Sequence, residues 1–269
     1  MHGRHKNKAL VNRSLSHHRP HMTKTETTPD PTRRSTVRKR TAAERGQAEH
    51  GWLHARFTFS FAEYFDPDHM GFRSLRVMNN DIIEPGGGFP MHPHRDAEIF
   101  TYVISGQLEH RDSMGNGSVI APGNLQYMSA GSGVRHSEFN PSKDTPTELY
   151  QIWLRPRRSG GEPLYSEKRL GDTAQPNALT LLFSGESRGG ATEIRQDAEI
   201  SFGRLNAGKS LSTENGVDLP HAWLQVIDGS VETLGETLAK ADGLAISDHP
   251  EAFEIRANSD AQFLLFRLN

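Results

Sequence analysis

Short apolar runs separated by glycine-containing turns fill the chain from residue 51 to the C-terminus. Apolar and polar residues alternate over residues 57–61, and much of residues 100–103 follows the same period of two, which is typical of strands. Turn residues recur about every eight to twelve positions, a spacing that predicts a β-barrel or β-sandwich. The nearest candidate for an amphipathic helix is residues 231–241, which Gly235 interrupts.

One strand–turn–strand pattern occurs twice. The segment VISGQLE at residues 103–109 returns as VIDGSVE at residues 226–232, 123 positions later. The segment APGNL at residues 121–125 is answered by ADGLA at residues 241–245, 120 positions later. Two matches at nearly one offset indicate two similar barrels in tandem. We therefore expect a first barrel over residues 46–160 and a second over residues 161–269.

The segment before the first barrel has a different composition. Residues 1–46 carry twelve Lys or Arg against three Asp or Glu, whereas the whole chain has a formal net charge of -2. With no hydrophobic period to order it, we expect residues 1–45 to be a disordered basic arm. Its cluster at residues 38–40 lacks interleaved aromatic residues, so we do not expect nucleic-acid binding. Met22 is an alternative start, which would make residues 1–21 a leader.

The composition also narrows the chemistry. The chain has no cysteine, which excludes disulfides, thiolate-bound metals, iron–sulfur clusters and cysteine nucleophiles. Any metal must therefore bind through His, Asp or Glu. The mean hydropathy is -0.65, and no apolar run approaches the roughly 18 residues of a membrane span. Since no secretory signal opens the chain, we expect a cytoplasmic protein.

Two histidine motifs carry the candidate chemistry. A glycine-rich turn leads to His92-Pro93-His94, and 44 residues after His92 the chain reads His136-Ser137-Glu138. Alternate residues of a strand share one face, so both members of each pair can point into one cavity. Four such ligands leave one or two positions open on a first-row metal, which suits a catalytic site. Elsewhere in the folded part we expect ordinary, singly hydrogen-bonded histidines at His50, His54, His69, His110, His221 and His249.

These motifs resemble those of cupins and, in more detail, those of the pirin family. The matching segments include GW at residues 51–52, FRSLRV at 72–77, HPHRD at 92–96, EHRDSMGN at 109–116 and RHSEFNPS at 135–142. The family consists of bicupins, in which two jelly-roll-like β-barrels pack face to face and the N-terminal barrel holds one metal ion. The resemblance implies the metal ligands His92, His94, His136 and Glu138. It implies Fe2+ as the ion, while Cu2+, Ni2+, Mn2+ and Co2+ suit the same donors.

Two carboxylates compete for the place of the fourth ligand. Glu98 stands where the general cupin motif has its glutamate, but Gly106 follows it one position later than in that motif. The ligand carboxylate of pirins follows the last histidine, so we favour Glu138 and keep Glu98 in reserve. In the second barrel the residues 123 positions after the two motif histidines are Asn215 and Val217, so we expect no metal there.

The resemblance also implies an activity. Many bacterial pirin-like proteins are associated with quercetin 2,3-dioxygenase activity, in which dioxygen cleaves the heterocycle of a flavonol with release of carbon monoxide. Glu138 would then be the catalytic group that takes the proton of the flavonol hydroxyl. A flat aromatic substrate needs an apolar mouth. The candidates for this mouth are Phe89, Met91, Tyr127, Met128 and Phe139.

A second interpretation belongs to a different class of protein. Some pirins resemble iron-containing regulators that bind a transcription factor or an enzyme in a metal-dependent way. The basic arm would then supply salt-sensitive affinity for the protein partner. A sugar-binding or isomerising cupin is a weaker third interpretation, because the motifs are pirin-like throughout. We expect a monomer, since the paired barrels already cover one another.

Overall fold

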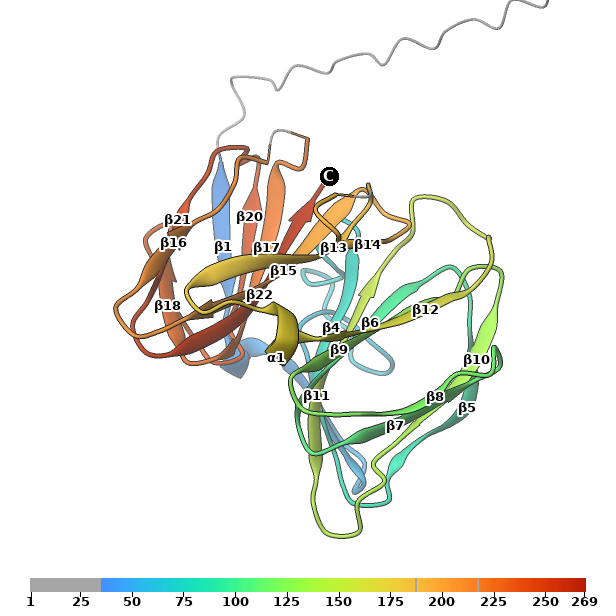
Figure 1. The fold of residues 1–269 in the computed structure, drawn as a ribbon. Coiled ribbons are helices and arrows are strands. Elements are labelled where there is room, and N and C mark those ends of the chain that lie inside the picture. The colour runs from blue at the N-terminus through green and yellow to red at the C-terminus, as the bar shows by residue number, and fades with distance from the viewer. Residues whose placement is uncertain (1–34, 187, 217) are drawn as a thin grey trace, which may run out of the picture. The chain divides into compact units, whose positions relative to one another are not determined.

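The structure is a computed structural model that describes residues 35–186, 188–216 and 218–269. The leader expected at residues 1–21, most of the expected arm, and Val217 lie outside the described residues. Nearly every element is a strand (Figure 1). The helices of the described part are η1 (Ala42–Glu44) and α1 (Leu170–Thr173), and none is long and apolar enough to span a membrane.

The described strands form two barrels of the same construction, each with a seven-stranded and a four-stranded sheet (Figure 1). The large sheet of the first barrel runs in the order β12 (Leu164–Arg169), β9 (Asn124–Ser129), β6 (Glu98–Ser105), β11 (Thr147–Leu154), β4 (Leu75–Ile83), β3 (Leu53–Phe57) and β2 (Gly46–Glu49). Its small sheet runs β5 (Gly88–His94), β10 (Val134–Phe139), β7 (Leu108–Asp112) and β8 (Gly117–Ile120).

The second barrel repeats this arrangement. Its large sheet runs β1 (Thr36–Arg40), β20 (Gly243–Ser247), β17 (His221–Asp228), β22 (Ala261–Leu268), β15 (Ala198–Leu205), β13 (Ala178–Ser184) and β14 (Thr192–Glu193). Its small sheet runs β16 (Ser210–Ser212), β21 (Glu254–Ala257), β18 (Ser230–Thr233) and β19 (Glu236–Ala239).

The internal repeat corresponds to equivalent turns in the two barrels. Gly106 joins β6 to β7, and Gly229 joins β17 to β18. Their φ angles are 73° and 76°, a left-handed backbone that glycine adopts without steric cost. The all-β architecture of two tandem barrels is therefore confirmed.

Two strands differ from the borders expected from the sequence. β1 lies within the segment expected to be a disordered arm, yet Thr36 to Arg40 pair antiparallel with β20 of the second barrel. β12 lies beyond the expected border at residue 160, yet it pairs with β9 of the first barrel. The expectation of disorder up to residue 45 is wrong for β1, because backbone pairing orders a strand that has no hydrophobic pattern.

Two local expectations are also wrong. Strand β3 ends at Phe57, and the expected strand over residues 57–61 gives way to a bend in which Phe59 joins the core between the barrels. Residues 231–241 form the β18–β19 hairpin instead of a helix. Leu234 and Gly235 at its tip have φ angles of 47° and 81°, the conformation of a two-residue hairpin turn.

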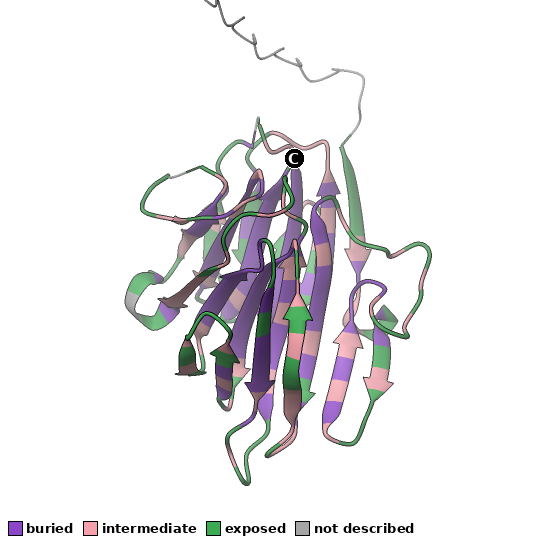
Figure 2. Cartoon of the chain, turned by 90° about the vertical axis from the view of Figure 1, so that its right-hand side faces the viewer, coloured by how far each residue is buried: buried purple, intermediate pink, exposed green. Residues whose placement is uncertain are grey.

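The central strands of the large sheets are buried on both faces, which explains their continuous apolar runs (Figure 2). In β6, Ile99 and Val103 face the interior of the first barrel, whereas Phe100 packs against Phe183 of the second barrel with ring centroids 5.1 Å apart. One apolar cluster contains buried residues of both barrels. The two barrels therefore share a core, and the small sheet of the first barrel lies away from it.

Candidate metal centre

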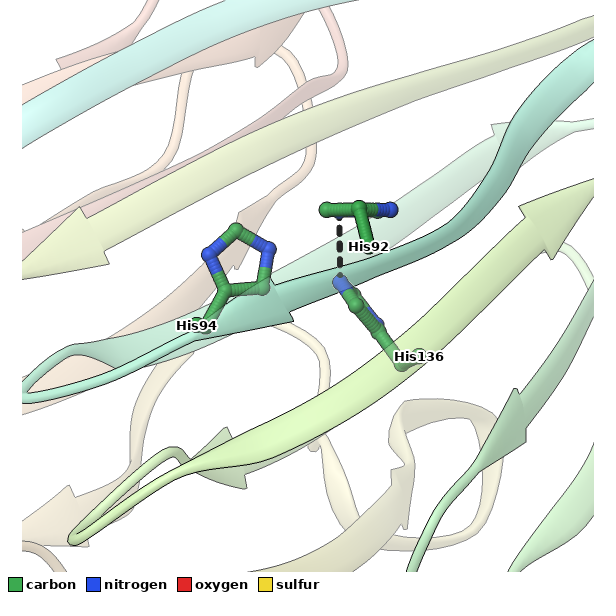
Figure 3. A group of neighbouring side chains, drawn as sticks. All are labelled: His92, His94 and His136. Atoms are coloured by element: carbon green, nitrogen blue, oxygen red, sulfur yellow. Dashed lines mark hydrogen bonds between the residues drawn. The ribbon is translucent and has the colours of Figure 1, made fainter.

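Three imidazole rings converge at the small sheet of the first barrel (Figure 3). His92 and His94 project from β5, and His136 projects from β10 directly opposite His92. The ring centroids are 4.5 Å apart for His92 and His136, 4.7 Å for His92 and His94, and 4.8 Å for His94 and His136. Gly88 permits this close pairing, because a Cβ there would collide with the backbone of β10.

The spacing of the nitrogens suits a single ion. The Nε2 atoms of His92 and His136 lie 3.1 Å apart. Two nitrogens that each lie about 2.1 Å from one ion, at a right angle, are about 3.0 Å apart. His136 is almost fully buried, while His92 and His94 are half-buried. The cluster therefore has its buried side on β10 and its accessible side on β5.

The surroundings of these imidazoles suit metal binding. The Nδ1 atom of His92 lies 2.8 Å from the carbonyl oxygen of Pro90, so Nδ1–H donates there and Nε2 keeps its lone pair. Burial, reinforced by the neighbouring histidines, lowers the pKa of His94 and of His136 to about 3. The neutral imidazole is the form in which histidine binds a first-row metal.

Glu138 is buried beside this cluster, on the same face of β10 as His136. Its carboxylate accepts hydrogen bonds from Gln151 Nε2 at 2.9 Å and from Thr101 Oγ1 at 3.2 Å. Burial raises the pKa of Glu138, against the opposing effect of nearby histidines and of these hydrogen bonds. Glu138 groups with His136 and His110 within 4.8 Å, and not with the His92–His94 pair.

Glu98, the reserve ligand, does not face the histidine cluster. It points to the other side of β6, where Tyr127 donates to its Oε2 at 2.5 Å and Ser129 donates to its Oε1 at 2.6 Å. The backbone N–H of Arg195, from the second barrel, also donates to Oε2 at 3.1 Å. Both carboxylate oxygens thus accept hydrogen bonds on the side away from the histidines, and Glu98 is in neither group of candidate ligands among the described residues.

His110 was expected to be an ordinary histidine, and the structure places it at the site. It lies on β7 directly opposite Glu138, and its ring centroid is 5.3 Å from that of His136. Asp112 accepts from its Nε2 at 3.3 Å, and Tyr165 stacks on its ring. The pairing of β7 with β10 brings it there, and no spacing within the sequence reveals this. Among the histidines expected to be ordinary, His54, His69 and His249 each face nearby carboxylates.

The walls around the cluster are partly those expected. Phe89 lies beside His92 with ring centroids 6.3 Å apart, and Met91 is exposed next to it. Tyr127 belongs to the core between the barrels. Met128 is buried in a separate apolar cluster of the first barrel, so neither side chain is accessible at the mouth. Trp153, which no sequence motif indicated, also lies at the cluster, with its ring edge-on to that of His94 and the ring centroids 4.9 Å apart.

Both groups of candidate ligands in the described residues lie in the first barrel. In the second barrel, the Oδ1 atom of Asn215 accepts a hydrogen bond from the backbone N–H of Ala252 at 2.8 Å. The fold and the site together define a bicupin with a histidine cluster of metal-binding type in its first barrel.

Comparison with known proteins agrees with this class. Residues 37–154 match the family model described as Pirin, and residues 181–268 match the model of the quercetinase C-terminal cupin domain. The chain belongs to the pirin family. It is 46% identical to quercetin 2,3-dioxygenase of Escherichia coli strain K12 over 85% of this chain and 97% of that protein. It is 41% identical to a pirin-like protein of Caulobacter vibrioides, over 82% and 94% of the two chains.

A solved relative has a metal bound. The bacterial pirin YhhW of Escherichia coli in complex with nickel(II) is 43% identical to this chain, with a TM-score of 0.81, over 87% of this chain and 99% of that one. The histidine cluster of the present chain thus occurs in a fold in which a relative binds a divalent metal.

Proposed function

We propose that this protein is a metal-dependent quercetin 2,3-dioxygenase that cleaves the heterocycle of a flavonol with dioxygen and releases carbon monoxide. The observation that carries the proposal is the convergence of three imidazoles at an accessible edge of the first barrel, with two Nε2 atoms 3.1 Å apart. Relatives of similar length that are 46% and 42% identical have the name quercetin 2,3-dioxygenase or putative quercetin 2,3-dioxygenase.

The proposed ligands are His92, His94, His136 and Glu138, and the proposed resident ion is Fe2+. Cu2+, Ni2+, Mn2+ and Co2+ are accepted by the same donors, and the nickel complex of the relative supports a divalent ion. When bound, such an ion supplies Lewis acidity and a template for the hydroxyl and keto oxygens of the flavonol. Imidazole ligands carry no charge of their own, so Glu138 is the one proposed ligand that reduces the positive charge of the ion.

The chain's own residues would orient the substrate and move one proton. Phe89 and Trp153 flank the cluster and provide aromatic surface for a flat ring system. Glu138 would take the proton of the flavonol hydroxyl at a carboxylate oxygen, since it is a buried carboxylate within 4.8 Å of a ring nitrogen of His136. Because Glu138 is surrounded by protein, bulk water does not compete for that proton.

Elemental analysis of the natively metallated protein and incubation with quercetin under air test the proposal together. We expect about one first-row ion per chain and loss of the flavonol absorbance with release of carbon monoxide. His92→Ala and Glu138→Ala should abolish this loss, whereas His54→Ala, on the outside of the same barrel, should not. Absence of turnover with every first-row metal, together with a metal-dependent protein partner, would favour the regulatory interpretation.

The paired barrels also support a monomeric protein as part of the proposal. The apolar face of each large sheet is covered by the other barrel, and one core serves both. Light scattering at micromolar concentration should therefore give the mass of one chain, 30.0 kDa. A mass near twice this value would contradict the monomer. The cytoplasmic location expected from the sequence stays a prediction.

A further inference from the structure

The carboxylate of Glu138 lies against two side chains of the large sheet. Gln151 on β11 donates its Nε2–H to Glu138 Oε2 at 2.9 Å, and Thr101 on β6 contacts Glu138 Oε1 at 3.2 Å. Thr101 and Gln151 are directly opposite each other in the β6–β11 pairing, and their side chains are 3.1 Å apart. Neighbouring strands of a rigid sheet therefore hold both of these polar groups.

The two contacts are not equivalent. The hydroxyl of Thr101 has a single proton, which it can donate either to Glu138 or to Gln151 Oε1. The amide of Gln151 must present its NH2 group to Glu138, because the opposite orientation would set its oxygen against a carboxylate oxygen. Gln151 is thus the constant donor to Glu138, and Thr101 supports both partners.

This arrangement keeps the carboxylate to one side of the three imidazoles. In the position described, Glu138 lies within 4.8 Å of candidate donor atoms on His136 and His110, but it is not part of the group that contains His92 and His94.

We propose that Gln151 and Thr101 are positioning residues that hold Glu138 off the metal ion. The inference rests on the proposed metal site. The two donors stabilise a second position of the carboxylate, in which one coordination position stays free for substrate oxygen and the carboxylate stays available as a proton acceptor. The metal ion and the Gln151 amide therefore compete for the carboxylate of Glu138.

This competition predicts the direction in which the affinity for the metal ion changes when a donor is removed. Removing the donor at Gln151 destabilises the position away from the metal, so the carboxylate should bind the ion more strongly. Damage to the site from a merely structural role would weaken metal binding. The affinity for Ni2+, measured on metal-free protein by competition with a chelator of known affinity, separates these outcomes without any assay of turnover.

We expect Gln151→Leu to bind Ni2+ about tenfold more tightly than the unaltered chain, because a hydrogen bond to a charged group is lost from the competing position. Thr101→Val should give a smaller gain of about threefold, and Thr101→Ser, which keeps the hydroxyl, should match the unaltered chain. In a Glu138→Gln background the gain from Gln151→Leu should disappear.

Unchanged or weaker Ni2+ binding in a folded Gln151→Leu protein would overturn the proposal, as would an equal gain in the Glu138→Gln background. If Gln151→Leu does not fold, the Thr101→Val and Thr101→Ser pair decides, since equal affinities in that pair also overturn it. Where the flavonol activity is present, Gln151→Leu should lower kcat more than it changes KM. Absence of flavonol turnover in the unaltered chain would refute the proposed function and leave the Ni2+ result valid.

Discussion

Glu98 and Glu138 are both buried carboxylates of the first barrel, but they accept hydrogen bonds from different surroundings. Glu98 binds donors of the core between the barrels, namely Tyr127, Ser129 and the backbone of Arg195. Glu138 lies in the barrel interior beside His136. The environment of each side chain, and not the residue type, separates a structural carboxylate from a candidate ligand.

Glu98→Gln should therefore lower the stability of the protein and leave metal binding unchanged. The substitution puts an NH2 group against donors that need a carboxylate oxygen, and the free energy of unfolding should fall by about 2–3 kcal/mol. Urea unfolding and metal analysis of the same preparation measure the two effects. Glu109→Gln on the exposed side of β7 is the control and should change stability by less than about 0.5 kcal/mol. Loss of metal from a stable Glu98→Gln protein would contradict this role.

The burial of Asp81 predicts that the folding stability of the metal-free protein depends on pH. It is buried on β4, and its Oδ1 has no hydrogen-bond partner among the described residues. Burial, reinforced by the charge of Glu138 and opposed by that of Arg45, raises the pKa of Asp81 to about 7. In the unfolded chain an aspartate has a pKa of about 3.9. Between these two values the folded protein binds more protons, so stability is lost as the pH rises from about 4 to about 7.

Asp81→Asn removes this loss, because the amide cannot ionise. Metal-free Asp81→Asn should equal the unaltered chain near pH 4 and exceed it at pH 8 by on the order of 2–4 kcal/mol. The lowered pKa values of His94 and His136 give a slope of opposite sign, but that slope is common to both proteins and cancels in the difference. A difference in urea midpoint that does not depend on pH would show that Asp81 does not titrate in this range.

At the scale of elements, β1 connects the two barrels. Its five residues pair with β20 in the second barrel. At its end the guanidinium of Arg40 lies 3.1 Å from the hydroxyl of Tyr64 and 3.3 Å from the carboxylate of Asp66, both in the first barrel. The strand is mostly exposed, so its contribution comes from backbone hydrogen bonds and from Arg40 rather than from apolar burial.

A chain that begins at residue 42 should be less stable than one that begins at residue 35, by about 2–4 kcal/mol, because it lacks several net-stabilising hydrogen bonds. Val37→Ala in the longer chain is the matched control and should have little effect, since Val37 is exposed. Chemical denaturation of the three proteins gives the comparison. Equal midpoints for the two chain lengths would mean that β1 pairs without stabilising the fold.

The elements also show where prediction from sequence succeeds and fails. The tandem repeat was readable because each barrel needs a glycine with positive φ at the same hairpin, Gly106 and Gly229. β1 was not readable, because its sequence TVRKR has no apolar face and only the neighbouring strand orders it. Residues 231–241, the nearest candidate for a helix, form the β18–β19 hairpin, and Gly235 in its turn was the available signal.

The candidate metal site also has residues whose placement the sequence predicts and residues whose placement it does not. The alternation of His92 and His94 on one strand predicted that their rings share a face, and the structure brings both to His136. The face taken by Glu98 was not predictable, because β6 is buried on both sides and has no polar face to read. His110 reaches Glu138 through the pairing of β7 with β10, whereas Thr101 and Gln151 reach it from the facing large sheet, 37 and 13 residues away in the chain, so no local pattern reveals these contacts.

At the scale of the whole molecule, the two barrels should unfold as one unit. Phe100 of the first barrel packs on Phe183 of the second. Across the same boundary, the ring centroids of Tyr102 and Phe202 lie 5.9 Å apart. Separating the barrels would expose this apolar core to water, at a cost of about 25 cal/mol for each Å² exposed. A barrel unfolded alone would leave the other with its apolar face uncovered.

Metal bound in the first barrel should therefore also stabilise the second. At a free Ni2+ concentration about one hundred times its Kd, a ligand that binds only the folded state adds about 2.7 kcal/mol to the free energy of unfolding. Hydrogen exchange should report the same gain for the slowest amides of β17 and β22 as for those of β6, because these open only in global unfolding. His92→Ala with the same Ni2+ should show no gain in either barrel. Protection that rises in β6 alone would establish that the barrels unfold separately in spite of their shared core.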